Sequence, residues 1–178
     1  MDMLAEAFGA LAVVLNFIGY RQNRVERYLV VSAFALLSVS IHFFMLGAMA
    51  AGIGTILASI RNIVALRFRG KRILALFVAA NIGFFLYEWF VLQHDAMIIV
   101  AYASSLIFTV GSIMLRDAMK LRQWFLLAEV LGLMYAISVG SIFGTVFNVS
   151  NLFSIITKLL TERRRSAREA ALQGQSKD

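Results

Sequence analysis

The sequence predicts an all-α integral membrane protein with seven transmembrane helices, arranged as two parallel three-helix repeats joined by a linker helix. Three observations predict this fold class. Of the 178 residues, 61% are hydrophobic and only 15% are charged, which is too apolar for a soluble domain of this size. Basic residues gather in alternate loops between apolar stretches of membrane-spanning length. The first and last parts of the chain are also weakly similar to each other.

Each expected span is an apolar stretch of about 20 residues, the length that crosses about 30 Å of hydrocarbon at about 1.5 Å per residue. The start "MDMLAEAF" is acidic where a signal peptide is basic, so we expect the first stretch to be a span and not a cleaved leader. Gly47 and Gly140 favour tight turns between spans two and three and between spans six and seven. The expected spans cover residues 3–20, 28–46, 49–67, 73–92, 96–115, 123–140 and 142–161.

The basic residues set the expected orientation. The loops after spans one, three and five and the tail after span seven carry Arg and Lys, whereas the loops after spans two, four and six carry neither. The positive-inside rule therefore places the N-terminus outside and the C-terminus in the cytoplasm. The net charge of +7 belongs to these flanks, and because no aromatic stacking platform accompanies it we expect no nucleic-acid partner. The tail is expected to be a stop-transfer flank, with contact to anionic lipid as the alternative.

Two offsets, of 92 and 93 residues, align the first and last parts of the chain. Because a single span separates the two copies, both run in the same direction, an arrangement known from transporters. The expected units are the repeats 1–72 and 96–162, the linker helix 73–95, and a disordered basic tail 163–178. The aligned pairs are Gly19 with Gly111, Arg24 with Arg116, Gly52 with Gly144, His42 with Tyr135, and Gly47 with Gly140.

Arg61 in span three and Glu129 in span six are charges expected inside the membrane. Each shares a helix face with small residues, and small residues let helices approach closely, so both charges are expected in helix interfaces and not in lipid. Arg61 lies six residues before Arg67, about 9 Å inside the basic boundary, and Glu129 lies about 10 Å inside Arg122. The small residues are Gly54, Ala58 and Ala65 in span three, and Gly132, Ala136 and Gly140 in span six.

The matching depths lead to the hypothesis that Arg61 and Glu129 form an ion pair, because charges within a membrane generally find partners. The alternative is that they act separately. Arg61 then extends its guanidinium to the cytoplasmic headgroups, and Glu129 is protonated in its apolar surroundings.

Uncharged polar side chains within the spans are candidates for a solute path. His42 is expected to be a neutral structural histidine that donates to Ser38 or to a carbonyl, with solute contact or proton coupling as the alternative. The asparagines are expected either to join helices or to bind a solute. By contrast, Glu6, Glu88 and Asp95 lie near the outer span ends and are expected to reach water. The path candidates are His42, Asn62, Tyr135, Asn148 and Asn151.

No catalytic motif is present in the sequence. It contains no HExxH, GxSxG or GxxxxGK[ST] pattern. The two histidines, His42 and His94, do not have zinc-ligand spacing, and the absence of cysteine excludes disulfides and thiolate sites. We therefore expect no enzyme, no bound metal and no cofactor.

Two blocks, "HFFMLGAMAAG" running to "ASIRN" and the later "GSIFGT", resemble the YgjV family of bacterial inner-membrane proteins. The resemblance covers nearly the whole chain. Two positions depart from the family pattern, since a proline is expected at Ala50 and a second histidine at Tyr135. The matching positions are His42, Phe43, Phe44, Leu46, Gly47, Ala48, Ala51, Gly52, Ile60 and Arg61, then Gly140, Ser141, Ile142, Gly144 and Thr145.

The resemblance implies a location in the bacterial inner membrane but no established activity. The three, one, three topology is similar to that of the MtN3/SWEET and PQ-loop carriers, which implies a solute path between two three-helix bundles. Such carriers use prolines as hinges, and this chain has none. Either glycines are the hinges, with Gly52 and Gly144 as the candidates, or transport is absent. Two functional hypotheses follow: a facilitator or proton-coupled carrier of a small polar solute, or a non-transporting membrane scaffold that binds a partner. The sequence leaves the solute, the coupling ion and homo-oligomer formation open.

Overall fold

The computed structural model describes residues 3–20, 22, 25–68, 70–115 and 118–175. Within these ranges the chain forms seven α-helices, one short π-helical segment and no strand, which confirms the predicted all-helical class. The elements are α1 (Met3–Tyr20), α2 (Val25–Met45), α3 (Met49–Val64), α4 (Lys71–Tyr87), η1 (Glu88–Leu92), α5 (Ile98–Met114), α6 (Ala118–Ser138) and α7 (Ile142–Gln175).

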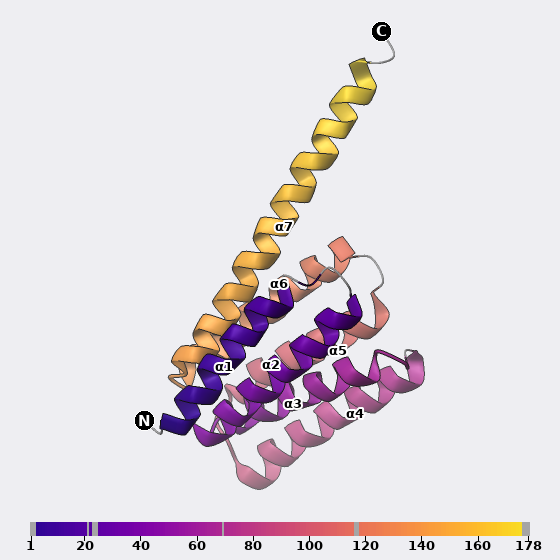
Figure 1. Cartoon of the computed structure of the whole chain (residues 1–178). Helices are drawn as coiled ribbons and strands as arrows, with labels where there is room; N and C mark the ends of the chain where they lie inside the picture. Colours follow the sequence, from indigo (N-terminus) through magenta and orange to yellow (C-terminus); the bar gives the residue numbers. More distant parts are fainter. Residues whose placement is uncertain (1–2, 21, 23–24, 69, 116–117, 176–178) are drawn as a thin grey trace.

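Successive helices run antiparallel in a bundle with two distinct ends (Figure 1). We call the end where α1, α3 and α5 finish the basic end, and the end where α2, η1 and α6 finish the turn end. Helix α2 packs between α1 and α3, and α6 packs between α5 and α7. These two halves, α1–α3 and α5–α7, meet through α1 against α7 and through α3 against α5, while α4 packs on α3 and α5.

Several helices are suited by length and composition to a bilayer. Within the described residues, three are long and apolar enough to cross one: Glu26–Met45, Lys71–Leu92 and Ile142–Ser166. Three shorter helices, Met3–Gly19, Met49–Val64 and Ile98–Met114, are also apolar. Large apolar side chains such as Leu76, Phe90 and Phe153 are exposed on the outside of the bundle, and lipid tails can cover such a surface.

The predicted glycine turns are confirmed at the turn end. Gly47 has φ +74° and Gly140 has φ +70°, a left-handed conformation that glycine adopts without steric cost. After each glycine the backbone N–H, of Ala48 or Ser141, donates to the carbonyl five residues earlier at 2.9 Å. This closure resembles the Schellman motif that commonly ends helices. The two turns therefore have the same local geometry at positions that the 93-residue offset aligns.

The segment predicted to be a disordered tail is described as helix as far as Gln175. Helix α7 continues to Gln175 and projects beyond the basic end of the bundle (Figure 1). Its 34 residues correspond to about 51 Å of helix. The segment "ERRRSAREAALQGQ" consists mainly of good helix formers and contains no proline, so nothing in it ends the helix that the apolar part begins. Ser176, Lys177 and Asp178 of the predicted tail lie outside the described residues.

Candidate functional site

Polar side chains are buried between the two halves of the bundle. Contacts that cross from the half α1–α3 to the half α5–α7 are described one by one below. A buried polar group needs a hydrogen-bond partner because losing water is costly, so these contacts fix how the halves meet. The buried polar residues at the site are Asn16, His42, Arg61, Asn62, Glu88, Thr109, Glu129, Ser141, Asn148 and Asn151.

His42 makes the first crossing contact, at the turn end. Its Nδ1 lies 2.8 Å from the carbonyl oxygen of Ala5 in α1, and its Nε2 lies 2.8 Å from Oγ of Ser141, directly before α7. Since a carbonyl can only accept, Nδ1 carries a proton, and a neutral ring then accepts the Ser141 hydroxyl proton at Nε2. Ser141 Oγ in turn accepts from the N–H of Gly144 at 2.9 Å. These contacts favour the structural role. Of the two acceptors expected for His42, Ser38 or a carbonyl, the structure shows a carbonyl, that of Ala5, while Ser38 donates to Phe34.

Tyr135 makes the second crossing contact, in the opposite sense. It lies on α6, and its hydroxyl is hydrogen-bonded to the backbone of Ala51 in the first turn of α3. His42 of α2 thus reaches the start of α7, and Tyr135 of α6 reaches the start of α3. The 93-residue offset that aligns His42 with Tyr135 therefore aligns two side chains with corresponding positions between the halves.

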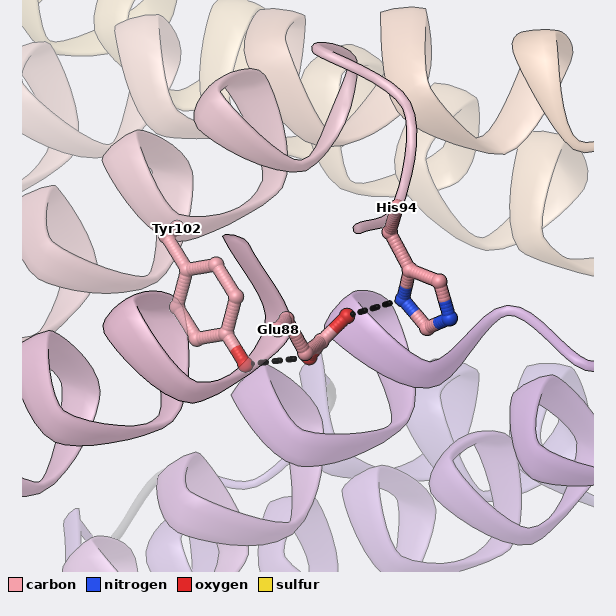
Figure 2. A network of polar contacts seen from close by, with 3 residues as sticks. All are labelled: Glu88, His94 and Tyr102. Carbon is pink, nitrogen blue, oxygen red and sulfur yellow. Dashed lines mark hydrogen bonds and ion pairs between the residues drawn. The ribbon is translucent and has the colours of Figure 1, made fainter. Parts of the chain in front are cut away.

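Glu88 forms a polar network at the turn end, as Figure 2 shows. The Tyr102 hydroxyl of α5 donates to Glu88 Oε1 at 2.5 Å. His94 Nδ1 lies 2.9 Å from Oε2, which makes an ion pair when the imidazole is protonated. The Glu88 side chain is 0% exposed, whereas the His94 side chain is 37% exposed. The network therefore connects a fully buried carboxylate to a partly exposed imidazole.

The prediction that Glu88 reaches water is wrong, because Tyr102 of α5 and His94 of the following turn enclose its side chain. After Tyr87 the chain changes from α to π geometry for five residues, then ends at Gln93 in a left-handed conformation. A π-turn bonds to the fifth residue and so shifts the side-chain register relative to an α-helix. Glu88 begins this segment and lies against Tyr102, while Asp95 remains exposed as expected.

Arg61 makes the third crossing contact, in the half of the bundle nearer the basic end. Its side chain is 4% exposed in the interface of α3 with α5. One terminal nitrogen donates to Thr109 Oγ1 at 3.2 Å, and the other donates to Asn62 Oδ1 at 3.4 Å. Asn62 Nδ2 in turn donates to Ser32 Oγ of α2 at 3.2 Å. The expectation that Arg61 lies in a helix interface is confirmed, and it does not extend to the surface.

Asn151 of α7 makes the fourth crossing contact. Its Oδ1 accepts from Asn16 Nδ2 of α1 at 2.5 Å, and its own Nδ2 donates to Glu129 Oε1 of α6 at 2.8 Å. Asn151 thereby joins three helices from both halves. This is the helix-joining role that the sequence offered as one of two interpretations of the asparagines.

The predicted ion pair of Arg61 with Glu129 does not form in this structure. Among the described residues the two side chains have separate partners: Thr109 and Asn62 for the arginine, and Asn151 for the glutamate. Tyr28 of α2 lies near both. Equal depth along the bundle axis therefore did not bring the charges together, because depth does not specify the direction in which a side chain leaves its helix.

Asn148 lies where α5, α6 and α7 meet. Its Nδ2 donates to the Gly144 carbonyl within α7 at 2.7 Å. Its Oδ1 lies close to Gly132 of α6, 2.6 Å from where a Cβ would be, and Ser104 Oγ lies 3.5 Å from the same point. Gly132 therefore makes room for the asparagine amide in the interior.

The hinge candidates Gly52 and Gly144 are sites of close helix packing. A Cβ on Gly52 would lie 2.5 Å from Cε1 of Phe44, and one on Gly144 would lie 2.6 Å from Cζ of Phe43. Both phenylalanines belong to α2, which therefore packs on one glycine in each half. A hinge role for either glycine stays a prediction.

Residue-by-residue inspection of the sequence missed Tyr102 and Thr109. They stand seven residues apart on α5, a spacing that places two side chains on one helix face. That pattern was the available signal. In the described part of the chain, no group of three or more metal-ligating side chains comes together.

An all-helical bundle with an apolar exterior and a hydrogen-bonded polar interior defines an integral membrane protein. The chain belongs to the Imp-YgjV family of bacterial inner membrane proteins, whose family model matches residues 3–166. The resemblance seen in the sequence is thereby confirmed at the level of the family. No curated protein and no solved structure matches the chain.

Proposed function

We propose that this protein is a carrier or facilitator of a small polar solute in the bacterial inner membrane. In this proposal its seven helices all span the bilayer, the N-terminus lies outside, and the C-terminus lies in the cytoplasm. The observation that carries the proposal is that the halves meet through buried polar contacts: His42 with Ser141, Arg61 with Thr109, and Asn16 with Asn151. Polar groups inside a membrane are costly and commonly line solute or ion pathways.

The arrangement of the helices supports a repeat architecture like that of SWEET carriers. Exchanging the halves converts the contact of α1 with α7 into the contact of α5 with α3, and both contacts are present. It also exchanges the glycine turns at Gly47 and Gly140, which share one geometry. Parallel repeats of this kind move as bodies about a site between them in alternating-access transporters.

The proposed path runs between the halves along the bundle axis. His42 and Tyr135 lie toward the turn end, Asn148 lies deeper among three helices, and Asn62 and Asn151 lie toward the basic end. During transport the crossing hydrogen bonds would be exchanged for bonds to the solute, so that each polar group keeps a partner.

Thiol labelling tests the path, because the chain has no cysteine of its own. A single cysteine in place of Asn148 is expected to react with a membrane-impermeant thiol reagent in proteoliposomes, since the path hydrates as the halves move. A cysteine in place of the neighbouring Val149, which is exposed on the outside of the bundle, is the matched control and is expected to stay unreactive in lipid. The carrier proposal would be contradicted if both variants were labelled only at background level and no uptake were found across a broad panel of polar solutes.

Asn151 favours the second candidate function, a non-transporting scaffold that binds a partner. Its two hydrogen bonds join α1, α6 and α7, as expected if polar groups serve only to hold helices together. A scaffold predicts that Asn148→Cys stays unlabelled and that substitutions of Asn151 change stability with no effect on any solute flux. The labelling experiment therefore separates the two candidates.

A further inference from the structure

The guanidinium of Arg61 is the buried positive group whose hydrogen-bond partners in the described structure are all neutral. It donates to the Thr109 hydroxyl at 3.2 Å and to the Asn62 amide oxygen at 3.4 Å. Its Nε is buried and has no hydrogen-bond partner among the described residues. An arginine stays protonated in proteins and offers five N–H donors, so part of its donor capacity and all of its charge are left without a matching acceptor.

The carboxylates of the described residues do not compensate this charge. Glu129 accepts from Asn151, and Glu88 is bound to His94 and Tyr102 at the opposite end of the bundle. No carboxylate in the described part of the chain lies within ion-pair distance of Arg61; His94 is the residue that pairs with Glu88. A charge inside a bilayer costs about 3 kcal/mol on insertion scales, and a buried charge is tolerated when an opposite charge with good geometry accompanies it.

The geometry of the free donors specifies the partner. A carboxylate or phosphate binds an arginine through two parallel N–H···O bonds, and this planar fork is what distinguishes arginine from lysine. The Arg61 Nε and a terminal nitrogen beside it form such a fork. The Thr109 hydroxyl, which accepts from Arg61, has its own proton available for an anion at the same place. Tyr28, half-buried near the start of α2, lies near Arg61.

We propose that Arg61 binds an anionic group, a carboxylate or a phosphate, between α3 and α5 and is joined there by Thr109. As a statement about transport this rests on the proposed carrier function, since it makes the solute an anion that enters from the basic end. The same chemistry could be supplied by the phosphate of a lipid headgroup, because Arg61 lies about 9 Å inside the position of Arg67.

Thermal unfolding of the purified protein in zwitterionic nanodiscs tests the proposal. The probes are inorganic phosphate, acetate and succinate, with glycerol as the neutral probe and sodium chloride at matched ionic strength as the salt control. The wild type is expected to be stabilised by phosphate or a carboxylate and not by glycerol or salt. Arg67→Gln, which removes an exposed arginine near the same end of α3, is the matched control and should behave as the wild type.

Substitutions of Arg61 and Thr109 test whether the stabilisation by anions depends on these two side chains. Arg61→Lys keeps the charge but loses the planar fork, and we expect its apparent anion affinity to fall about tenfold or more. Arg61→Gln is expected to lose the stabilisation altogether. If Arg61→Gln does not fold, Arg61→Lys and Thr109→Val provide the comparison. A wild type that no anion stabilises, or a stabilisation that Arg61→Lys and Thr109→Val leave unchanged, would overturn the proposal.

Two further arms identify the source of the anion and separate this inference from the proposed function. Stabilisation by phosphatidylglycerol nanodiscs that depends on Arg61 and is reduced by added phosphate would support the site and identify a lipid headgroup. Arg61-dependent binding of phosphate without uptake of any solute would support the site and contradict the carrier. Uptake of neutral solutes, unaffected in Arg61→Lys and without anion binding, would support the carrier and overturn the anion site.

Discussion

His42 Nε2 and Ser141 Oγ lie 2.8 Å apart and join α2 of one half to the start of α7 in the other. Ser141 also accepts the N–H of Gly144. His42 Nε2 and the Gly144 N–H therefore both lose this partner if the Ser141 hydroxyl is removed. We therefore expect Ser141→Ala to lower the free energy of unfolding by about 1–3 kcal/mol, the cost of leaving buried polar groups unsatisfied. Thermal unfolding in detergent measures this change. Ser138→Ala, at an exposed serine near the same turn, is the control and should change the free energy of unfolding little. Equal effects of the two substitutions would contradict the role assigned to Ser141.

We expect Glu88 to stabilise the turn end of the bundle through the hydrogen bonds it accepts. Glu88→Ala leaves the buried Tyr102 hydroxyl without its acceptor, and we expect a loss of about 1–3 kcal/mol in the free energy of unfolding. Glu88→Gln keeps one amide oxygen as an acceptor and should lose less. Asp95→Ala, at an exposed carboxylate nearby, is the control. Unfolding curves that do not distinguish Glu88→Ala from Asp95→Ala would count against the network.

A double-mutant cycle tests whether Arg61 and Glu129 act separately. Because they share no hydrogen bond in the structure, the effects of Arg61→Gln and Glu129→Gln on the free energy of unfolding should add within about 0.5 kcal/mol. A coupling well above that value would restore the ion pair that the sequence suggested.

The cycle of Asn151→Ala with Glu129→Ala should behave differently, since these side chains are bonded at 2.8 Å. Interhelical hydrogen bonds in membranes average about 0.6 kcal/mol and reach about 1.7 kcal/mol. We expect a coupling of this size in unfolding measurements. The control cycle replaces Asn151→Ala by Thr157→Ala, at an exposed threonine of the same helix. We expect Thr157→Ala to show no coupling to Glu129→Ala.

The two close-packed glycines should differ in their tolerance of a methyl group. Gly144→Ala meets Phe43, which is buried, and should cost about 1–3 kcal/mol as overpacking. Gly52→Ala meets Phe44, which is partly exposed and can move outward, so its cost should be smaller. Gly83→Ala in α4 meets nothing within 4 Å and should stabilise by about 0.5–1 kcal/mol. The melting temperatures of the three variants check this, and we expect Gly83→Ala to be the highest and Gly144→Ala the lowest. The reverse order would contradict the packing described for these glycines.

The candidate site could be predicted only in part. Arg61, Asn62 and Asn151 were found because a polar residue in an apolar helix is visible in the sequence and has to be satisfied. Their partners were not found, since the contacts join residues far apart: 48 positions for Arg61 with Thr109, and 99 for His42 with Ser141. Thr109 and Tyr102 are ordinary residues for a membrane helix, and their seven-residue spacing on one face of α5 was the only local signal that distinguished them.

The sequence by itself determined the helical membrane class, the positions of the helices and the glycine turns at Gly47 and Gly140. These depend on apolar length and on backbone conformation, which are local properties of the chain. Only the tertiary structure decided that Glu88 is buried and that Arg61 faces Thr109 and not Glu129. The partners depend on how each helix is rotated about its axis, and a five-residue π-turn changes that rotation. Packing against neighbouring helices sets the rotation, and the residues of one helix do not contain that information.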